Sequence, residues 1–141
     1  MGGSFIMNIK EKYKMQEIIN NYLDWFKSST IITPIESADK ETVKVSTMFL
    51  DSHNDGIEFY IQKIDDNYIA LTDDGWYLQD LESCGLDLNS SRITEQINWY
   101  RNFLNLDIVE GEISSVVRLD ENIPLKIHAY IQALILITAL D

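Results

Sequence analysis

Residues 129–140 carry no charge and are apolar at nearly every position, so any fold of this chain has to keep them from water. The stretch is 12 residues long, which is typical of a buried core helix and too short to cross a membrane. Pro124 suits the first turn of a helix, and the pattern predicts a helix from there to about Leu140. We expect this helix to lie in the core, with a homodimer interface as its alternative role.

The rest of the chain favours a single α+β domain over residues 8–141. With 141 residues, 45% of them hydrophobic, the chain can build a core without disulfides or structural metal. Its single cysteine, Cys84, excludes a disulfide scaffold and a Cys-based zinc finger. Apolar residues recur at helical spacing over residues 8–27, which predicts an amphipathic helix that packs on the core. Residues 1–7 are interpreted as an added, disordered leader, with natural translation starting at Met7.

Alternating apolar and polar residues predict an antiparallel meander sheet of about four to six short strands. The predicted strands are 31–35, 43–50, 57–64, 68–71 and a hairpin within 108–119. Two helices are expected in addition to the first and last ones, over 76–84 and after a cap at Ser90 or Ser91. The predicted fold is therefore an N-terminal helix, an antiparallel sheet and three further helices, including the apolar C-terminal one, packed largely on one face.

The charge of the chain is strongly acidic and unevenly distributed. Eleven basic and twenty-three acidic residues give a net charge of -12, which disfavours binding to a nucleic-acid backbone or an anionic membrane. Between Asp51 and Asp87 there are ten acidic residues and one basic residue, Lys63. This region is either a solvated face that keeps the protein soluble or a negative surface for a cation or a basic protein.

The densest polar cluster is the loop 51–56, and the antiparallel order of strands brings residues 72–75 beside it. One interpretation is structural, because Asn, Asp and Gly build tight turns and Asp caps helices. The other is a binding site, and its carboxylates with His53 suit Mg²⁺, Mn²⁺ or Ca²⁺. The candidate binding residues are Asp51, His53, Asn54, Asp55, Glu58, Asp73 and Asp74, of which Asp51, Asp55, Asp73 and Asp74 are the candidate metal ligands.

The sequence gives little support for a nuclease site, a nucleophilic triad or stacking on nucleic-acid bases. Phe59 and Tyr60 follow Glu58, so the Glu-x-Lys pattern of restriction-type nucleases is missing. Ser52, His53 and Asp55 share one loop, where three residues rarely present a nucleophilic triad. The tryptophans fall within helix patterns, which favours the core or an interface over base stacking; they are Trp25, Trp76 and Trp99.

Several segments resemble one known family: FLDSHND at 49–55, LTDDG at 71–75, LESCGL at 81–86 and the stretch 128–133. Together they are similar to the bacterial and phage family called domain of unknown function 1828, over about Tyr22–Leu140. The chain departs from the family pattern at Met48, where the pattern has proline. The resemblance implies a cytoplasmic protein of bacteria, phages or other mobile elements. It implies no established activity, so no residue is taken over as catalytic.

We therefore expect a noncatalytic protein-binding domain whose partner is a basic or nucleic-acid-binding protein. As a phage or mobile-element protein it would inhibit a bacterial defence protein, as anti-CRISPR proteins do. Carboxylates two residues apart on a strand lie about 6.6 Å apart and can imitate a row of phosphates. Cofactors, direct nucleic-acid binding and membrane binding are not expected. The alternative is a metal-dependent hydrolase or nucleotide-binding domain that uses the loops 51–55 and 73–74 with Mg²⁺ or Mn²⁺.

Overall fold

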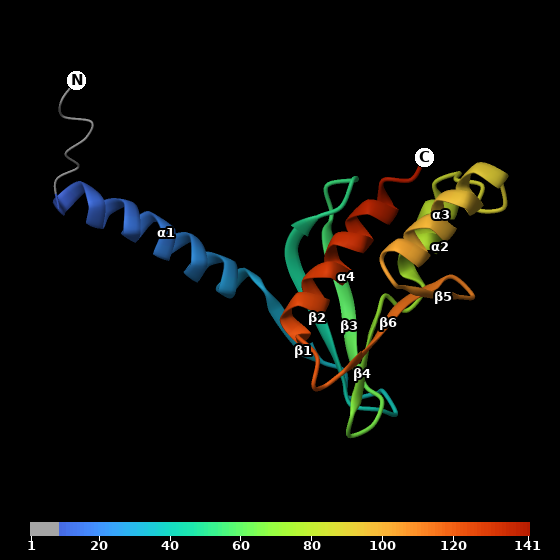
Figure 1. Ribbon diagram of the computed structural model, residues 1–141, viewed down its shortest axis with the longest axis horizontal. Coiled ribbons are helices and arrows are strands. Elements are labelled where there is room, and N and C mark those ends of the chain that lie inside the picture. The colour runs from blue at the N-terminus through green and yellow to red at the C-terminus, as the bar shows by residue number, and fades with distance from the viewer. Residues whose placement is uncertain (1–8) are drawn as a thin grey trace. The chain divides into compact units, whose positions relative to one another are not determined.

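The computed structural model describes the backbone of residues 9–141 and the side chains from residue 14 onward. The predicted leader, residues 1–7, lies outside the described residues. The chain divides into two compact units, residues 1–30 and residues 31–141 (Figure 1).

The first unit contains one long helix, α1 (Ile9–Ser29), where the sequence predicts a helix. In the described part of this unit the helix has no second element to pack on, so its apolar face is not covered there. The core packing expected of this helix is therefore not found within its own unit. The side chains that are more than half exposed are Met15, Ile18, Ile19, Tyr22, Leu23 and Trp25.

The second unit is built on a six-stranded sheet in which every neighbouring pair is antiparallel. The strands are β1 (Ile31–Pro34), β2 (Thr42–Leu50), β3 (Gly56–Lys63), β4 (Tyr68–Thr72), β5 (Asp107–Val109) and β6 (Glu112–Arg118). Their spatial order is β1-β2-β3-β4-β6-β5, so the three-strand meander predicted from the alternating pattern forms the centre of the sheet. The predicted hairpin is β5–β6, and both of its turn residues, Glu110 and Gly111, have positive φ, as a two-residue type I′ turn requires.

Three helices complete this unit: α2 (Trp76–Ser83), α3 (Ser91–Phe103) and α4 (Ile123–Thr138). The Ser90 hydroxyl accepts a hydrogen bond from the Ile93 amide and so caps α3, as the sequence predicts. The three helices and the sheet confirm the predicted α+β class. Within the described part of the chain, no helix has the length and apolar character that a membrane crossing needs.

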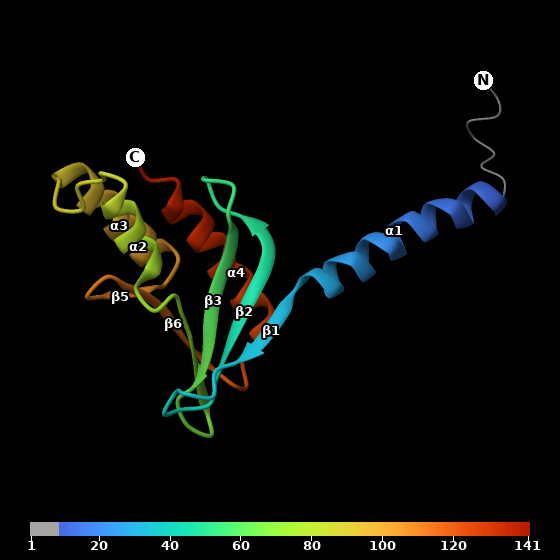
Figure 2. The same ribbon diagram turned by 180° about the vertical axis from the view of Figure 1, so that it is seen from behind.

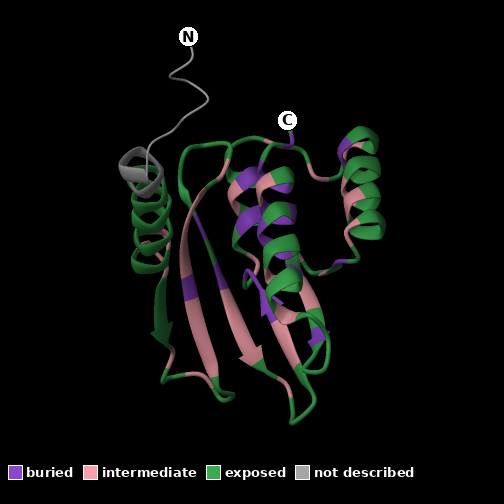
Figure 3. Ribbon diagram, turned by 60° about the vertical axis from the view of Figure 1, so that its left-hand side comes forward, coloured by how far each residue is buried: buried purple, intermediate pink, exposed green. Residues whose placement is uncertain are grey.

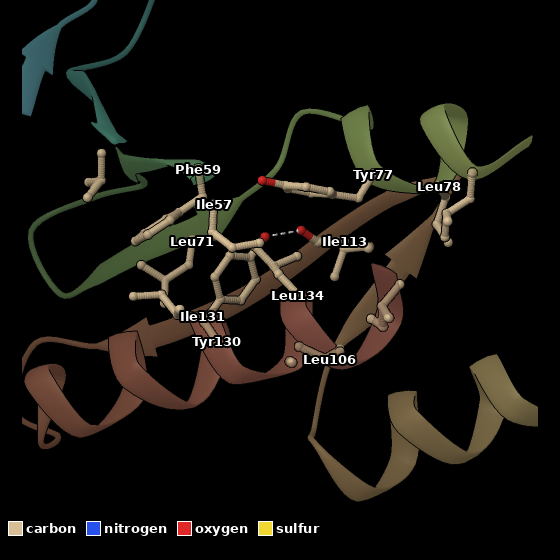
Figure 4. Packing of buried hydrophobic residues seen from close by; sticks show 14 of the residues in the cluster. Ile57, Phe59, Leu71, Tyr77, Leu78, Leu106, Ile113, Tyr130, Ile131 and Leu134 are labelled. Carbon is tan, nitrogen blue, oxygen red and sulfur yellow. Dashed lines mark hydrogen bonds between the residues drawn. The ribbon is translucent and has the colours of Figure 1, made fainter. Parts of the chain in front are cut away.

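The core lies between one face of the sheet and α4, which runs across that face (Figures 1 and 3). Alternate strand residues point into it, as a half-buried sheet requires. The charge-free stretch 129–140 is therefore a core helix, and few of its apolar side chains remain exposed. The fully or almost fully buried residues at the centre are Ile57, Phe59, Leu71, Ile113, Val117, Tyr130, Ile131, Leu134 and Ile137 (Figure 4).

The opposite face of the sheet carries polar side chains, and in the view from behind β2 and β3 lie in front of α4 (Figure 2). Residues paired across strands share a face, which places Lys44, Tyr60 and Thr72 in one row. Ser46 and Glu58 form the next pair on the same face. We call this surface the open face.

None of the three tryptophans lies in the core, so a core role is wrong for each of them. Their exposed fractions are 53% for Trp25, 62% for Trp76 and 57% for Trp99. Helical spacing alone does not show which side of a helix is covered, and in α2 and α3 the covered side is the one that faces α4 and the sheet.

Tyr130 joins α4 to the sheet by a hydrogen bond inside the core. Its hydroxyl donates to the Ile113 carbonyl oxygen at 2.6 Å, and its ring packs edge-on against Phe59 (Figure 4). Burial raises the pKa of this hydroxyl, so it stays a neutral donor.

We expect Tyr130→Phe to lower the free energy of unfolding by about 1–2 kcal/mol, because a buried hydrogen bond is lost while the ring packing remains. Urea denaturation measures this change. Tyr68→Phe is the matched control, since Tyr68 is exposed. Equal stability of the Tyr130→Phe variant and the wild type would contradict the role given to this hydroxyl.

Candidate functional site

A pocket of about 590 Å³ opens at the edge of the open face, where the β2–β3 loop meets the β4–α2 turn. The antiparallel order of β2, β3 and β4 brings the loop and the turn to the same end of the sheet. The sequence predicts this proximity, and the structure has it. The pocket is lined by Lys44, Asp51, Asp55, Gly56, Glu58, Tyr60, Asp73, Asp74, Trp76, Tyr77 and Asp80.

The lining is strongly acidic, since it contains six carboxylates and one ammonium group. Like charges at this density destabilise one another unless the fold or a ligand compensates them. What each carboxylate contacts therefore decides what the pocket can bind.

Asp73 is the most deeply buried of the six, with 2% of its surface exposed. One oxygen, Oδ1, accepts the amides of Gly75 at 3.0 Å and Ile113 at 2.9 Å. The other, Oδ2, accepts the amide of Tyr77 at 3.0 Å. Asp73 thus caps the start of α2 and ties it to β6, so of the two aspartates predicted as caps it is Asp73 that has this role.

Burial raises the pKa of the Asp73 carboxyl above its ordinary value, although the amides of Tyr77, Ile113 and Gly75 act in the opposite direction. The turn that presents it is tight, because Asp74 and Gly75 both adopt positive φ, 55° and 79°. Glycine takes this conformation without a steric penalty, and Asp tolerates it better than most residues.

Tyr77 fixes the floor of the pocket. β4 ends at Thr72, opposite Tyr60, so the backbone of Glu58 lies beyond the last β3–β4 pair. The Tyr77 hydroxyl takes the place of a strand there: it accepts the Glu58 amide at 2.9 Å and donates to the Glu58 carbonyl at 3.2 Å. Burial raises the pKa of Tyr77 to about 12.

Asp51 shapes the β2–β3 loop. Its Oδ1 accepts the amides of His53 at 2.8 Å and Asp55 at 3.0 Å. The same loop is tied to α4, since the Ser52 hydroxyl donates to the Thr138 carbonyl oxygen. The Asp51 carboxylate is therefore used by its own loop, as Asx turns use it.

Glu58 is engaged by its neighbours on β2. Its carboxylate lies 3.0 Å from the Lys44 ammonium and accepts the Ser46 hydroxyl at 3.3 Å. The hydrogen bond and the charge of Glu58 raise the pKa of Lys44. The pair is partly exposed, so it neutralises charge locally but adds little stability.

The remaining three carboxylates, those of Asp55, Asp74 and Asp80, line the same pocket. Among the described residues, none forms an ion pair or a side-chain hydrogen bond with them. The indole of Trp76, the first residue of α2, also lines the pocket and is mostly exposed. We call Asp55, Asp74, Asp80 and Trp76 the free rim.

The structure brings together five of the seven residues predicted to bind: Asp51, Asp55, Glu58, Asp73 and Asp74. The other two, His53 and Asn54, are exposed in the same loop but do not line the pocket. In the part of the chain that the structure describes, no three His, Cys, Asp or Glu residues are grouped so that they could hold a metal ion.

Sequence reasoning misses Lys44, Tyr60, Trp76, Tyr77 and Asp80. Two signals point to four of them in hindsight. Lys44 pairs directly with Tyr60 on the polar side of the strands, and Trp76 and Asp80 are four residues apart, on one face of α2.

We expect Asp73→Asn to lower the free energy of unfolding by about 1–3 kcal/mol. An amide group at this position turns an N–H toward a backbone N–H, so a buried donor loses its acceptor. Chemical denaturation of the variant beside Asp74→Asn measures this cost. Asp74 is exposed and Asn tolerates positive φ, so the control should stay within about 0.5 kcal/mol of wild type. A loss of the same size in both variants would contradict the capping role.

Because of Tyr77, the free energy of unfolding should depend on pH in the alkaline range. Its pKa in the fold is raised to about 12 from 10.0, so the folded chain keeps a proton that the unfolded chain releases. The stability gained from this group is complete below pH 10 and is lost as the pH rises from 10 to 12. Relative to Tyr77→Phe, wild type should lose on the order of 2–3 kcal/mol over that window. Urea denaturation at several alkaline pH values tests this, and a constant difference would refute it.

A family model described as "Domain of unknown function DUF1828" matches residues 47–137. The matched range includes every pocket residue except Lys44. No curated protein and no solved structure matches the chain. Because the family model covers well over half of its residues, the chain belongs to the DUF1828 family.

Proposed function

We propose that this chain is a noncatalytic binding domain whose pocket receives a cationic side chain, above all arginine, from a basic protein. The observation that carries the proposal is the free rim: three carboxylates without a partner among the described side chains surround one pocket with an exposed tryptophan. Carboxylates with no intramolecular partner are available to a ligand, and their mutual repulsion falls when a cation enters.

The chemistry of the rim suits a guanidinium group. Carboxylates accept arginine in pairs of parallel hydrogen bonds, and arginine also stacks on indole faces. Asp80 follows Trp76 by one helical turn, so one ligand can reach both from the same side of α2. Aromatic and acidic groups in one pocket favour a planar cation over a small spherical one.

The hydrogen bonds of the carboxylates outside the free rim argue against the metal-dependent hydrolase or nucleotide-binding alternative. Oxygens of Asp51 and Asp73, two of the four candidate metal ligands, already accept backbone amides. Moving the Asp73 oxygens onto a metal would leave the buried amides of Tyr77 and Ile113 without acceptors, which is costly. Moving the Asp51 oxygen would break the exposed turn that it holds in its own loop. The proposed role therefore uses the free rim and leaves the structural carboxylates in place.

The net charge of -12 supports a nucleic-acid-binding protein as the partner class. A surface that binds phosphates carries arginine and lysine, and an acidic domain competes for them. The carboxylates come from a loop, a strand, a turn and a helix, so they offer a cluster and not a row along one strand. We extend the proposal to inhibition of a bacterial defence protein by a phage or mobile-element protein in the cytoplasm.

The test uses a fluorescein-labelled nona-arginine peptide and measures its anisotropy during titration with the protein. Asp74→Asn combined with Asp80→Asn should weaken binding about tenfold, because two ion pairs of roughly 0.5–1 kcal/mol are lost. The wild-type affinity should fall as salt rises.

Glu41→Gln combined with Glu121→Gln is the matched control. Both residues are exposed, lie outside the pocket and adjoin the end of the sheet opposite to it, and the change in net charge is the same. This control should bind the peptide within about twofold of wild type, since its charges lie away from the site. An equal loss in both double variants would assign the binding to net charge and refute the pocket.

A further inference from the structure

The apolar side of α1 has no partner within the described part of its own unit. Met15, Ile19, Tyr22 and Phe26 follow one another at spacings of four, three and four residues, which aligns them along one side of the helix. Ile18, Leu23 and Trp25 widen this stripe. We call these seven residues the α1 stripe.

The back of the helix is polar. At about 100° per residue, Glu17 and Asp24 lie on the side opposite the α1 stripe, and Asn20 lies near them. Tyr22 contacts both Trp25 and Phe26, with ring centroids 6.2 Å and 6.5 Å apart, so the aromatic part of the stripe is one continuous patch. A helix of this kind is stabilised mainly by burying its apolar side against another element.

We propose that the α1 stripe is a homodimer interface, covered by α1 of a second copy of this chain. The charge distribution favours this occupant. Residues 1–30 contain four of the eleven basic and three of the twenty-three acidic residues, so they carry a net charge of +1. Residues 31–141 carry -13, and two copies of that unit repel each other. Two copies can therefore approach closely at α1.

The size of the stripe agrees with a dimer contact. Its six most exposed side chains are each more than half exposed. At roughly 200 Å² for a large side chain, they leave on the order of 600 Å² of apolar surface per copy. Two copies together would bury about 1,200 Å², the lower limit of a standard stable interface. The stripe also fits a two-fold contact, in which one surface pairs with itself.

α1 is a better dimer surface than α4, the helix for which the sequence predicts a homodimer. The buried side of α4 is part of the core, and the large apolar side chains that stay exposed on it are Leu125 and Leu136. The family match begins at residue 47, so α1 lies outside the matched range. The inference does not depend on the pocket or on its ligand.

The test is sedimentation velocity of the full chain over a wide concentration range. Wild type should sediment as a dimer, twice the 16.3 kDa of one chain, and dissociate on dilution. Ile19→Asp should weaken the dimer at least tenfold, because it places a charge in the middle of the stripe. Asn20→Asp adds the same charge on the back of the helix and should dimerise as wild type does.

A second readout locates the contact. With Trp76→Phe and Trp99→Phe, the remaining Trp25 should show blue-shifted emission in the dimer, and Ile19→Asp should remove the shift. A wild-type monomer at every concentration would overturn the proposal, as would a dimer that survives Ile19→Asp. A monomer that binds vesicles of phosphatidylcholine and phosphatidylglycerol would overturn it too, by assigning the stripe to a lipid surface.

Discussion

The carboxylate of Asp73 holds three elements of the second unit in register. It accepts amides from the turn after β4, from the first turn of α2 and from β6, all from a nearly fully buried position. Ile113 extends the link, since its carbonyl oxygen accepts the Tyr130 hydroxyl of α4. One buried acidic group thus connects the sheet, the helix beside the pocket and, through Ile113, the helix that fills the core. A network of this kind, fully satisfied, specifies one arrangement of the backbone.

The position of the pocket follows from this connection. Because Asp73 fixes the start of α2, the Tyr77 hydroxyl reaches the first residues of β3 and forms hydrogen bonds with the backbone of Glu58. The same turn places Trp76, Asp74 and Asp80 beside the β2–β3 loop. Three carboxylates are used to build the site, and three remain available at its rim. The first three hold the backbone around the pocket in place, and the other three leave its rim negatively charged. For this reason we propose that the pocket binds a cation and does not catalyse a reaction.

Much of the fold follows from the sequence, because the alternating strands at 43–50 and 57–64 and the charge-free stretch 129–140 are strong local signals. Their antiparallel order also predicts that the segments carrying Asp51 and Asp73 lie beside each other. Periodicity does not reveal which side of a helix another element covers, so it did not show that Trp76 and Trp99 lie on the exposed sides of α2 and α3. Whether a carboxylate is held by backbone amides or has no partner depends on single hydrogen bonds. The residue type alone does not predict those bonds.

The most direct test of this account is amide hydrogen exchange in the native protein, followed by NMR. If the Asp73 carboxylate accepts the amides of Tyr77 and Ile113, both should exchange as slowly as the amides of the central strands, such as that of Leu71. They should also become faster together in Asp73→Asn, while Leu71 changes less. Fast exchange at Tyr77 and Ile113 in the wild type, at the rate of exposed loops, would show that Asp73 does not organise this corner.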